Sequence, residues 1–352
     1  MDFVFHIGAP KAGSSSIQRL METEGAVTTE HRIHYPDISH HDLAQYLTAP
    51  NANPYRAQVW PLFQEVVESA RANTDSVVVS SEFFAGGPPE TLSALMEEHF
   101  PGERDTTRVI HYLRPHAQFF LSFFVQFSKR GRDVADMDKQ FEQFRDKQRL
   151  SFRRRVEAWE AVFGENYALR VLDRSRLKDG SITSDFLSFV CGEAPFEVVS
   201  EPQSNSSPTL EDMVFLRMVG NELRAVMGKK LPPELSGFMA YALTERMPNA
   251  KGTKVKLWRD LAERIRDLCA EDAAWLDAKL GGTSFADALD SAVEGALDGP
   301  QSLTFADHFD PGIERYAKVM AETIAELATV AGPPGPKRLR RKRLTEIRAT
   351  IK

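Results

Sequence analysis

The residues best suited to chemistry near the start of the chain lie in a short loop rich in glycine and serine. Residues 8–16 read Gly-Ala-Pro-Lys-Ala-Gly-Ser-Ser-Ser. The two glycines permit a tight backbone, the three serines offer hydroxyl donors, and Lys11 supplies a mobile cation. Backbone N–H groups and the positive end of a following helix also favour anions. The pattern therefore predicts a phosphate-binding loop over residues 10–16.

The order of residues in this loop limits the kind of phosphate that it binds. In the common nucleoside triphosphate loop, the lysine follows the last glycine and precedes a Ser or Thr that holds Mg²⁺. Here Lys11 precedes Gly13 by two positions. The ammonium group is thus expected within the loop, which argues against a metal-bound triphosphate.

Two further polar positions follow apolar runs. Glu82 comes directly after the run that ends at Ser81, and Arg114 comes directly after residues 108–113. A guanidinium group binds phosphate oxygens through a forked, charge-assisted contact. An ion pair of Arg114 with a carboxylate is the simpler alternative.

The elements that must position these groups follow from short apolar runs that alternate with helical patterns. Strands are predicted over residues 3–7, 76–81, 108–113 and 167–172, with helices from Ser14 onward and over residues 184–190. Phenylalanines between 119 and 127 recur at helical spacing and predict a helix whose aromatic face packs into the core. This order predicts an α/β fold with a mostly parallel sheet, whose ligands gather at the carboxyl ends of the strands.

The loop resembles the first cofactor motif of the sulfotransferases that use 3′-phosphoadenosine 5′-phosphosulfate (PAPS), which reads Pro-Lys-x-Gly-Thr/Ser-Thr/Ser after the first strand. The similarity is strongest to bacterial and carbohydrate-directed members, and it covers residues 1–280. It implies a P-loop-type sheet and PAPS as co-substrate, with no metal. The cofactor-binding residues that it implies are Lys11, Ala12, Gly13, Ser14, Ser15, Ser16, Arg114 and Ser122.

The resemblance also implies catalytic roles. Lys11 would stabilise the bridging oxygen as the sulfur–oxygen bond breaks, and Glu82 would take the proton of a hydroxyl or amine acceptor. The small-molecule branch of the family uses a histidine as this base, so His6 and His111 stay open, although both also fit a core role. The family's third contact to the 3′-phosphate is missing; Lys251-Gly252-Thr253-Lys254 is a substitute or, more simply, a solvated basic loop.

Beyond residue 200 the chain becomes helical, with helices predicted over 209–223, 234–243, 257–280 and 311–330. We expect three parts. Residues 1–280 form the sulfotransferase-like domain, 281–332 a helical extension, and 333–352 a flexible basic tail after a Pro/Gly break.

Composition excludes several classes of protein. A formal net charge of −6 argues against a general nucleic-acid binder, and two distant cysteines fit neither a disulfide framework nor a metal site. The absence of a long apolar run and of a signal-peptide pattern favours a cytoplasmic enzyme. A P-loop kinase and a non-catalytic nucleotide- or glycan-binding protein remain as alternatives, and the acceptor and the oligomeric state stay open.

Overall fold

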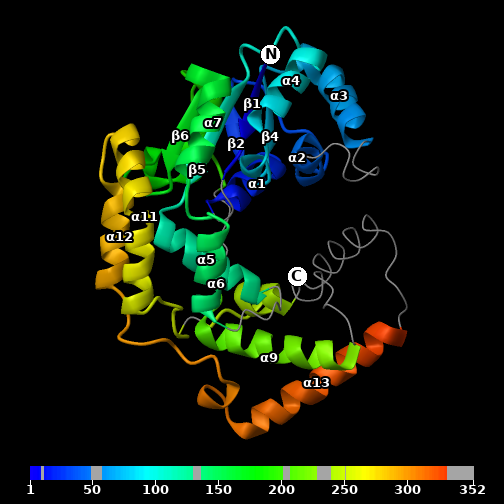
Figure 1. Cartoon of the computed structure of the whole chain (residues 1–352). Helices are drawn as coiled ribbons and strands as arrows, with labels where there is room; N and C mark the ends of the chain where they lie inside the picture. Colours follow the sequence, from blue (N-terminus) through cyan, green and yellow to red (C-terminus); the bar gives the residue numbers. More distant parts are fainter. Residues whose placement is uncertain are drawn as a thin grey trace. The chain divides into compact units, whose positions relative to one another are not determined.

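The computed structural model describes residues 1–8, 12–48, 58–129, 136–200, 207–227, 239–249 and 251–330. At its centre lies a five-stranded sheet in the order β3-β4-β1-β5-β6, in which every neighbouring pair is parallel (Figure 1). Its strands are β1 (Asp2–His6), β3 (Ile33–His34), β4 (Ser76–Ser80), β5 (Arg108–Leu113) and β6 (Tyr167–Val171). The predicted α/β fold with a mostly parallel sheet is confirmed.

The central strands are mostly buried and apolar in their middle, because both faces of the sheet are covered. The rings of Phe3 and Phe63 lie 6.2 Å apart on one face, whereas the ring of His6 lies 5.8 Å from that of Phe186 on the other. All five residues of β4 are buried. Such strands read as continuous hydrophobic runs, which is why the sequence revealed them.

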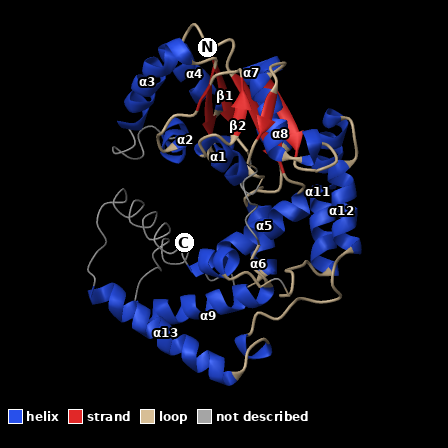
Figure 2. Ribbon diagram, turned by 180° about the vertical axis from the view of Figure 1, so that it is seen from behind, coloured by secondary structure: helices blue, strands red, loops and turns tan. Residues whose placement is uncertain are grey.

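Helices flank this sheet on both faces (Figure 2). Phe63 belongs to the helix before β4, and Phe186 to the helix after β6. The helices of the chain up to α8 are α1 (Ser14–Glu22), α2 (His40–Thr48), α3 (Val59–Ala70), α4 (Pro89–His99), α5 (His116–Lys129), α6 (Met137–Asp146), α7 (Arg153–Phe163) and α8 (Ile182–Cys191), and α11 (Arg259–Leu280) and α12 (Ser284–Glu294) follow later. The aromatic face of α5 packs into the core as predicted, with the rings of Phe120 and Phe144 5.6 Å apart.

A second, two-stranded sheet was not predicted. It pairs β2 (Val27–Thr29) with β7 (Phe196–Val198) in antiparallel register. Both strands have three residues and none of them is fully buried, so they lack the apolar run that marks the central strands. Leu20 and Leu187, buried in α1 and α8, pack beside this ribbon.

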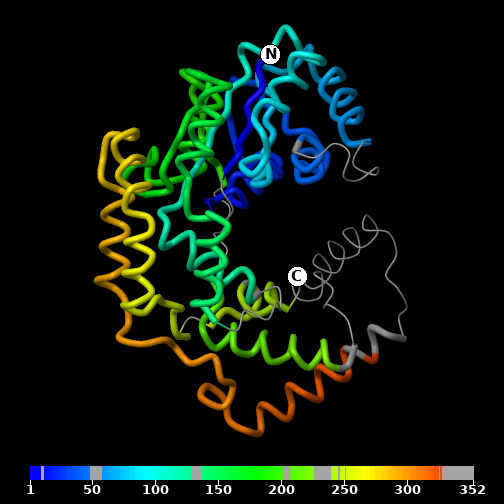
Figure 3. Tube along the Cα trace, in the orientation of Figure 1, coloured from blue at the N-terminus to red at the C-terminus, as the bar shows by residue number. Residues whose placement is uncertain are grey.

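The chain divides into two compact units, each built from segments that are separate in sequence (Figure 3). The first contains both sheets and comprises residues 1–124, 136–205 and 256–300. The second comprises residues 125–135, 206–255 and 301–352. Its described core joins α9 (Leu210–Met227) to α13 (Pro311–Val330), where Val219 and Leu223 pack with Ala317 and Ala321. These two helices confirm the prediction for 209–223 and 311–330. Of the helix predicted over 234–243, residues 234–238 lie outside the described residues and 239–243 are helical.

The compact units do not follow the boundary expected at residue 281, because α12 packs against α11 within the first unit. The Asp277 side chain of α11 accepts hydrogen bonds from the amides of Phe285 and Ala286, at 2.9 Å each, and so holds the start of α12. That residues 1–280 form one domain stays a prediction. The basic tail lies outside the described residues.

Candidate active site

Three of the predicted site segments follow three adjacent strands. β1 lies between β4 and β5, and His6 is in register with both Ser80 and Ile110. The amide of Ser81 then donates to the His6 carbonyl at 3.1 Å, and the amide of Ile7 donates to the Ile110 carbonyl at 3.0 Å. The phosphate loop, Glu82 and Arg114 therefore all leave the sheet at its carboxyl edge, where parallel sheets bind ligands.

The loop between β1 and α1 has the backbone that its glycines predicted. Gly13 adopts φ +85°, in the left-handed region, and directly precedes α1. No acidic side chain lies in the first turn of α1, and its N-cap residue, Gly13, has no side chain that could cap the helix. The Ser16 amide bonds the Gly13 carbonyl at 2.9 Å, so an anion at this helix start would meet the amides that precede Ser16. Lys11 and Pro10 lie outside the described residues.

The hydroxyl groups that follow Gly13 differ in exposure. Ser15 is exposed and Ser16 half-buried, while Ala12 is completely buried. Ser14 is only 4% exposed, and its Oγ has no hydrogen-bond partner among the described residues. Because an unpaired buried hydroxyl costs free energy, this atom fits a position that an anion oxygen completes.

Gly8 leaves room at the base of the same loop. A Cβ atom at this position would lie 2.5 Å from His6 Nε2 and 3.0 Å from Ser14 Oγ, so a larger residue does not fit without movement. His6 Nε2 is also buried and without a partner among the described residues. Two unsatisfied polar atoms thus border the space that the glycine keeps open.

Arg114 and Ser122 are brought together as predicted. Arg114 Nη1 donates to Ser122 Oγ at 2.9 Å, across the start of α5. Arg114 is half-buried, its Nε has no hydrogen-bond partner among the described residues, and burial lowers the pKa of the guanidinium. No ion pair joins Arg114 to a carboxylate in the part of the chain that the structure describes. A cation in this state is stabilised by an added anion.

Glu82 is half-buried and follows β4 by two residues. No hydrogen bond or ion pair links its carboxylate to another described residue, so pairing with Arg114 does not occupy it. Glu82 follows β4, the strand next to β1, and β1 leads into the phosphate loop. Its role as a base stays a prediction.

The two histidines considered as alternative bases both lie in the core. His6 and His111 are completely buried, and burial lowers the pKa of both, that of His6 to about 3. His6 Nδ1 pairs with Ser80 Oγ at 2.8 Å, and His111 Nδ1 pairs with the Tyr167 hydroxyl at 2.7 Å. Both rings are therefore neutral at ordinary pH, and Glu82 is the more exposed of the three groups.

The structure adds two histidines that the sequence did not single out. His40 and His41 open α2 and contact the end of β4, where His40 Nδ1 accepts from the Ser80 amide at 3.0 Å and His41 Nδ1 pairs with Ser81 Oγ at 2.9 Å. Nothing in the local sequence marks α2 as a neighbour of β4. These contacts depend on the tertiary fold.

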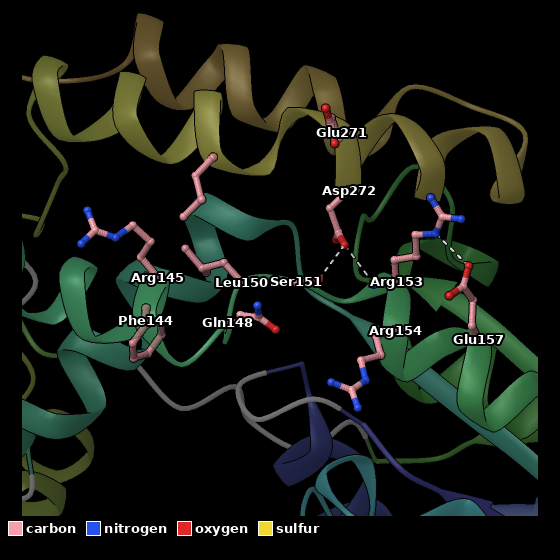
Figure 4. A pocket seen from close by; sticks show the side chains of 11 residues that line it. Phe144, Arg145, Gln148, Leu150, Ser151, Arg153, Arg154, Glu157, Glu271 and Asp272 are labelled. Carbon is pink, nitrogen blue, oxygen red and sulfur yellow. Dashed lines mark hydrogen bonds and ion pairs between the residues drawn. The ribbon is translucent and has the colours of Figure 1, made fainter.

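A surface pocket lies where α7 begins, and charged side chains surround it (Figure 4). Asp272 of α11 accepts from the amides of Phe152 and Arg153, at 3.0 and 2.9 Å, and pairs with His116 Nε2 at 2.8 Å. Burial raises the pKa of Asp272, but these hydrogen bonds outweigh it and hold the pKa below its ordinary value. The carboxylate thus serves as a cap for α7.

The predicted substitute for the third phosphate contact belongs to the second unit. Lys251 and Lys254 are exposed, and Thr253 between them bonds the Glu211 carboxylate through its amide, at 2.9 Å. The exposure of both lysines fits the simpler of the two alternatives, a solvated basic loop. Among the described residues, no group of three or more His, Cys, Asp or Glu side chains is placed to hold a metal ion. No helix in the described part is long and apolar enough to cross a membrane.

Comparison with known proteins gives one distant likeness. No family model matches the chain, and no curated protein matches it. Among solved structures, the chain is similar to a sulfotransferase from Alicyclobacillus acidocaldarius, with 14% sequence identity and a TM-score of 0.42, over 80% of this chain and 96% of that one. A likeness at this level assigns no family to the chain.

Proposed function

We propose that the protein transfers a sulfuryl group from PAPS to a hydroxyl or amine acceptor, which is a carbohydrate or glycoconjugate. The observation that carries the proposal is the pairing of Arg114 with Ser122 of α5, because Arg114 directly follows β5, the strand next to β1. One anion at the loop and a second at Arg114 match the two phosphate-bearing ends of an adenosine 3′,5′-bisphosphate. The polar atoms left unpaired on Ser14 and Arg114 support the same ligand.

In this proposal the chain's own residues bind, orient and move one proton. The N–H groups that open α1 and the hydroxyls of Ser14, Ser15 and Ser16 hold the 5′-phosphate, while Arg114 and Ser122 hold the 3′-phosphate. Glu82 accepts the acceptor proton as the acceptor oxygen or nitrogen bonds to sulfur. The bond from sulfur to the bridging oxygen of the phosphate breaks, Lys11 stabilises the charge on that oxygen, and adenosine 3′,5′-bisphosphate leaves.

Two other functions are less well supported. A P-loop kinase needs the Gly-Lys-Ser/Thr order and leaves Arg114 with Ser122 unexplained. A protein that only binds a nucleotide or a glycan needs no carboxylate at this edge of the sheet, whereas Glu82 follows the strand next to β1. The presence of this carboxylate supports transfer.

The first experiment tests the nucleotide. Adenosine 3′,5′-bisphosphate should raise the melting temperature, and ATP with Mg²⁺ should not. Arg114→Lys should weaken bisphosphate binding about 10- to 100-fold in calorimetry, because the forked contact to a charged group is lost. Arg170→Lys is a matched control, since Arg170 lies on the neighbouring strand β6 and is half-buried; it should bind within about twofold of wild type. Stabilisation by ATP with Mg²⁺ alone would reject the proposal.

The second experiment tests transfer. Sulfur-labelled PAPS supplied with cell extracts and a glycan and lipid panel should label an acceptor. Glu82→Gln should keep bisphosphate binding and lose about 10²- to 10⁴-fold in turnover, the usual contribution of a general base. Lys11→Ala should lose turnover while the protein stays folded. If wild type labels no acceptor, the protein is a binding protein and not a transferase.

A further inference from the structure

One face of α13 carries large apolar side chains that stay exposed. Another face of the same helix packs against α9 through Ala317 and Ala321 (Figure 1). Spacings of three and four positions place the exposed residues together along the helix. We call them the α13 stripe, which consists of Ile313 (44% exposed), Tyr316 (69%), Val319 (53%) and Met320 (59%).

The α13 stripe is large for a surface in contact with water. The exposed fractions correspond to a patch on the order of 500 Å², and apolar patches of this size on a single chain are often interaction sites. Tyrosine and methionine, which are enriched in protein interfaces, provide much of this area. Thr323 continues the same face, and its hydroxyl already donates to the Val319 carbonyl at 2.9 Å, so covering it leaves no donor unpaired.

Two opposite charges border the α13 stripe along one edge. Arg315 and Glu322 are exposed and lie seven positions apart, which is close to two helical turns, so they occupy the same side of the helix. Neither forms an ion pair with a residue in the part of the chain that the structure describes. Glu314 and Lys318, in contrast, pair with each other at 2.8 Å. The charges of Arg315 and Glu322 are therefore available to a partner.

A second copy of the same chain supplies the complementary charges. When two α13 helices lie antiparallel about a twofold axis, the same edge of each helix faces the other. Arg315 of one copy then meets Glu322 of the other, twice in each pair of chains. A parallel arrangement would instead place like charges beside each other. The charge pattern therefore favours an antiparallel pair, with the two apolar stripes in contact between the helices.

The size of the stripe is sufficient for such a contact. Two stripes that meet bury on the order of 1,000 Å², which is the lower end for a specific protein interface. An interface of this size is expected to have a dissociation constant in the micromolar range. The chain that follows α13 suits the stripe less well as a cover, because residues 337–343 consist of six basic residues and one leucine.

We infer that the protein forms a twofold-symmetric dimer through the α13 stripe, in which Arg315 of one copy pairs with Glu322 of the other. This inference does not depend on the proposed function, because α13 and the phosphate loop belong to different compact units. It assigns a partner, a second copy of this chain, to a helix that takes no part in the proposed transfer.

Sedimentation equilibrium of the full-length protein tests the association. The wild type should be a dimer at tens of micromolar and should dissociate on dilution. Met320→Lys should raise the dissociation constant about 10- to 100-fold, because each dimer would bury two unpaired ammonium groups. Leu268→Lys is the matched control, since Leu268 is 43% exposed but lies on α11; this variant should stay within about twofold of wild type.

Reversing the charges tests the arrangement of the helices. Arg315→Glu and Glu322→Arg should each raise the dissociation constant about 3- to 10-fold, because each change places like charges together at two points. The variant with both changes should return to within about twofold of wild type. A double variant as weak as the single ones would overturn the antiparallel pairing.

A cysteine at Val319 tests the position of the twofold axis. Pairing of Arg315 with Glu322 places this axis between residues 318 and 319, so the two copies of Val319 lie close together. Val319→Cys should form a disulfide-linked dimer on mild oxidation, visible on a non-reducing gel. Lys318→Cys should form little of it, because Lys318 points away from the stripe toward Glu314. The natural cysteines are buried and should not contribute.

Three results would overturn the inference. The first is a wild-type protein that stays monomeric at tens of micromolar. The second is a dimer whose dissociation constant is unchanged by Met320→Lys, because such a dimer would use another face. The third is a protein that dimerises only after residues 333–352 are removed, because the chain's own tail would then cover the α13 stripe.

Discussion

Replacing Gly13 with alanine should destabilise the protein through two separable effects. At φ +85° a Cβ atom costs about 1–2 kcal/mol. The same Cβ would lie 2.3 Å from Ile182 Cδ1, so the isoleucine must leave its rotamer, at about 0.5–1.5 kcal/mol. Because alanine restricts the unfolded chain more than glycine does, the substitution also raises the free energy of unfolding by about 0.4–1 kcal/mol. The expected net loss is about 2 kcal/mol of unfolding free energy.

The chain supplies a control that isolates the backbone effect. Gly25 has φ +72°, and a Cβ there meets no atom within 4 Å. Gly25→Ala should therefore cost about 1 kcal/mol or less. Urea denaturation followed by circular dichroism gives both values, and it also gives the effect of adding Ile182→Val, which removes the atom that the new Cβ meets.

The double variant sharpens the test. Gly13→Ala combined with Ile182→Val should lose less stability than the sum of the single changes, by about 1 kcal/mol. If Gly13→Ala costs no more than Gly25→Ala, or if the two changes at 13 and 182 are additive, the contact between the loop and α8 is not what restricts this position. Bisphosphate binding should fall in Gly13→Ala in either case, because the residue sets the backbone that opens α1.

Two further predictions concern stability. Asp272→Ala should cost about 3 kcal/mol in urea denaturation, since it removes the cap of α7 and a buried charged partner, whereas exposed Glu271→Ala should stay within about 0.5 kcal/mol. Burial lowers the pKa values of His6, His40 and His111. Below pH 6.5 these three rings therefore bind protons in the unfolded chain but stay neutral in the folded chain. Stability should be full above pH 6.5 and fall by about 4 kcal/mol from pH 6 to pH 5; stability that does not change over this interval would contradict the burial of these rings.

The parts of the fold that the sequence revealed are those set by local pattern. Three of the four long strands are almost completely buried and have an apolar run at their centre, whereas β6 alternates buried and half-buried residues. The tight turn at Gly13 and the helix after it follow from glycine and serine at a strand end. Arg114 and Ser122 were predicted together from the resemblance to the sulfotransferase motif, which places a serine eight residues after an arginine at a strand end, and the structure pairs the two side chains.

The parts that sequence reasoning missed depend on distant partners. β2 and β7 have three residues each, and their pairing joins segments about 170 residues apart, which no local pattern encodes. The contact of His41 with Ser81 likewise joins α2 to a residue 40 positions later in the chain. Two adjacent histidines at a helix start carry no signal of that contact.

The cap of α7 has a consequence for the order in which the chain becomes complete during synthesis. Asp272 bonds the Phe152 amide 120 residues earlier and His116 156 residues earlier. A ribosome that has made β5, α7 and β6 has not yet made the carboxylate that closes the first turn of α7. The strands of the sheet can therefore pair early, while the start of α7 gains its last hydrogen bonds only after α11 has emerged from the ribosome. Chains truncated before α11 should keep the amides at the start of α7 open to hydrogen exchange.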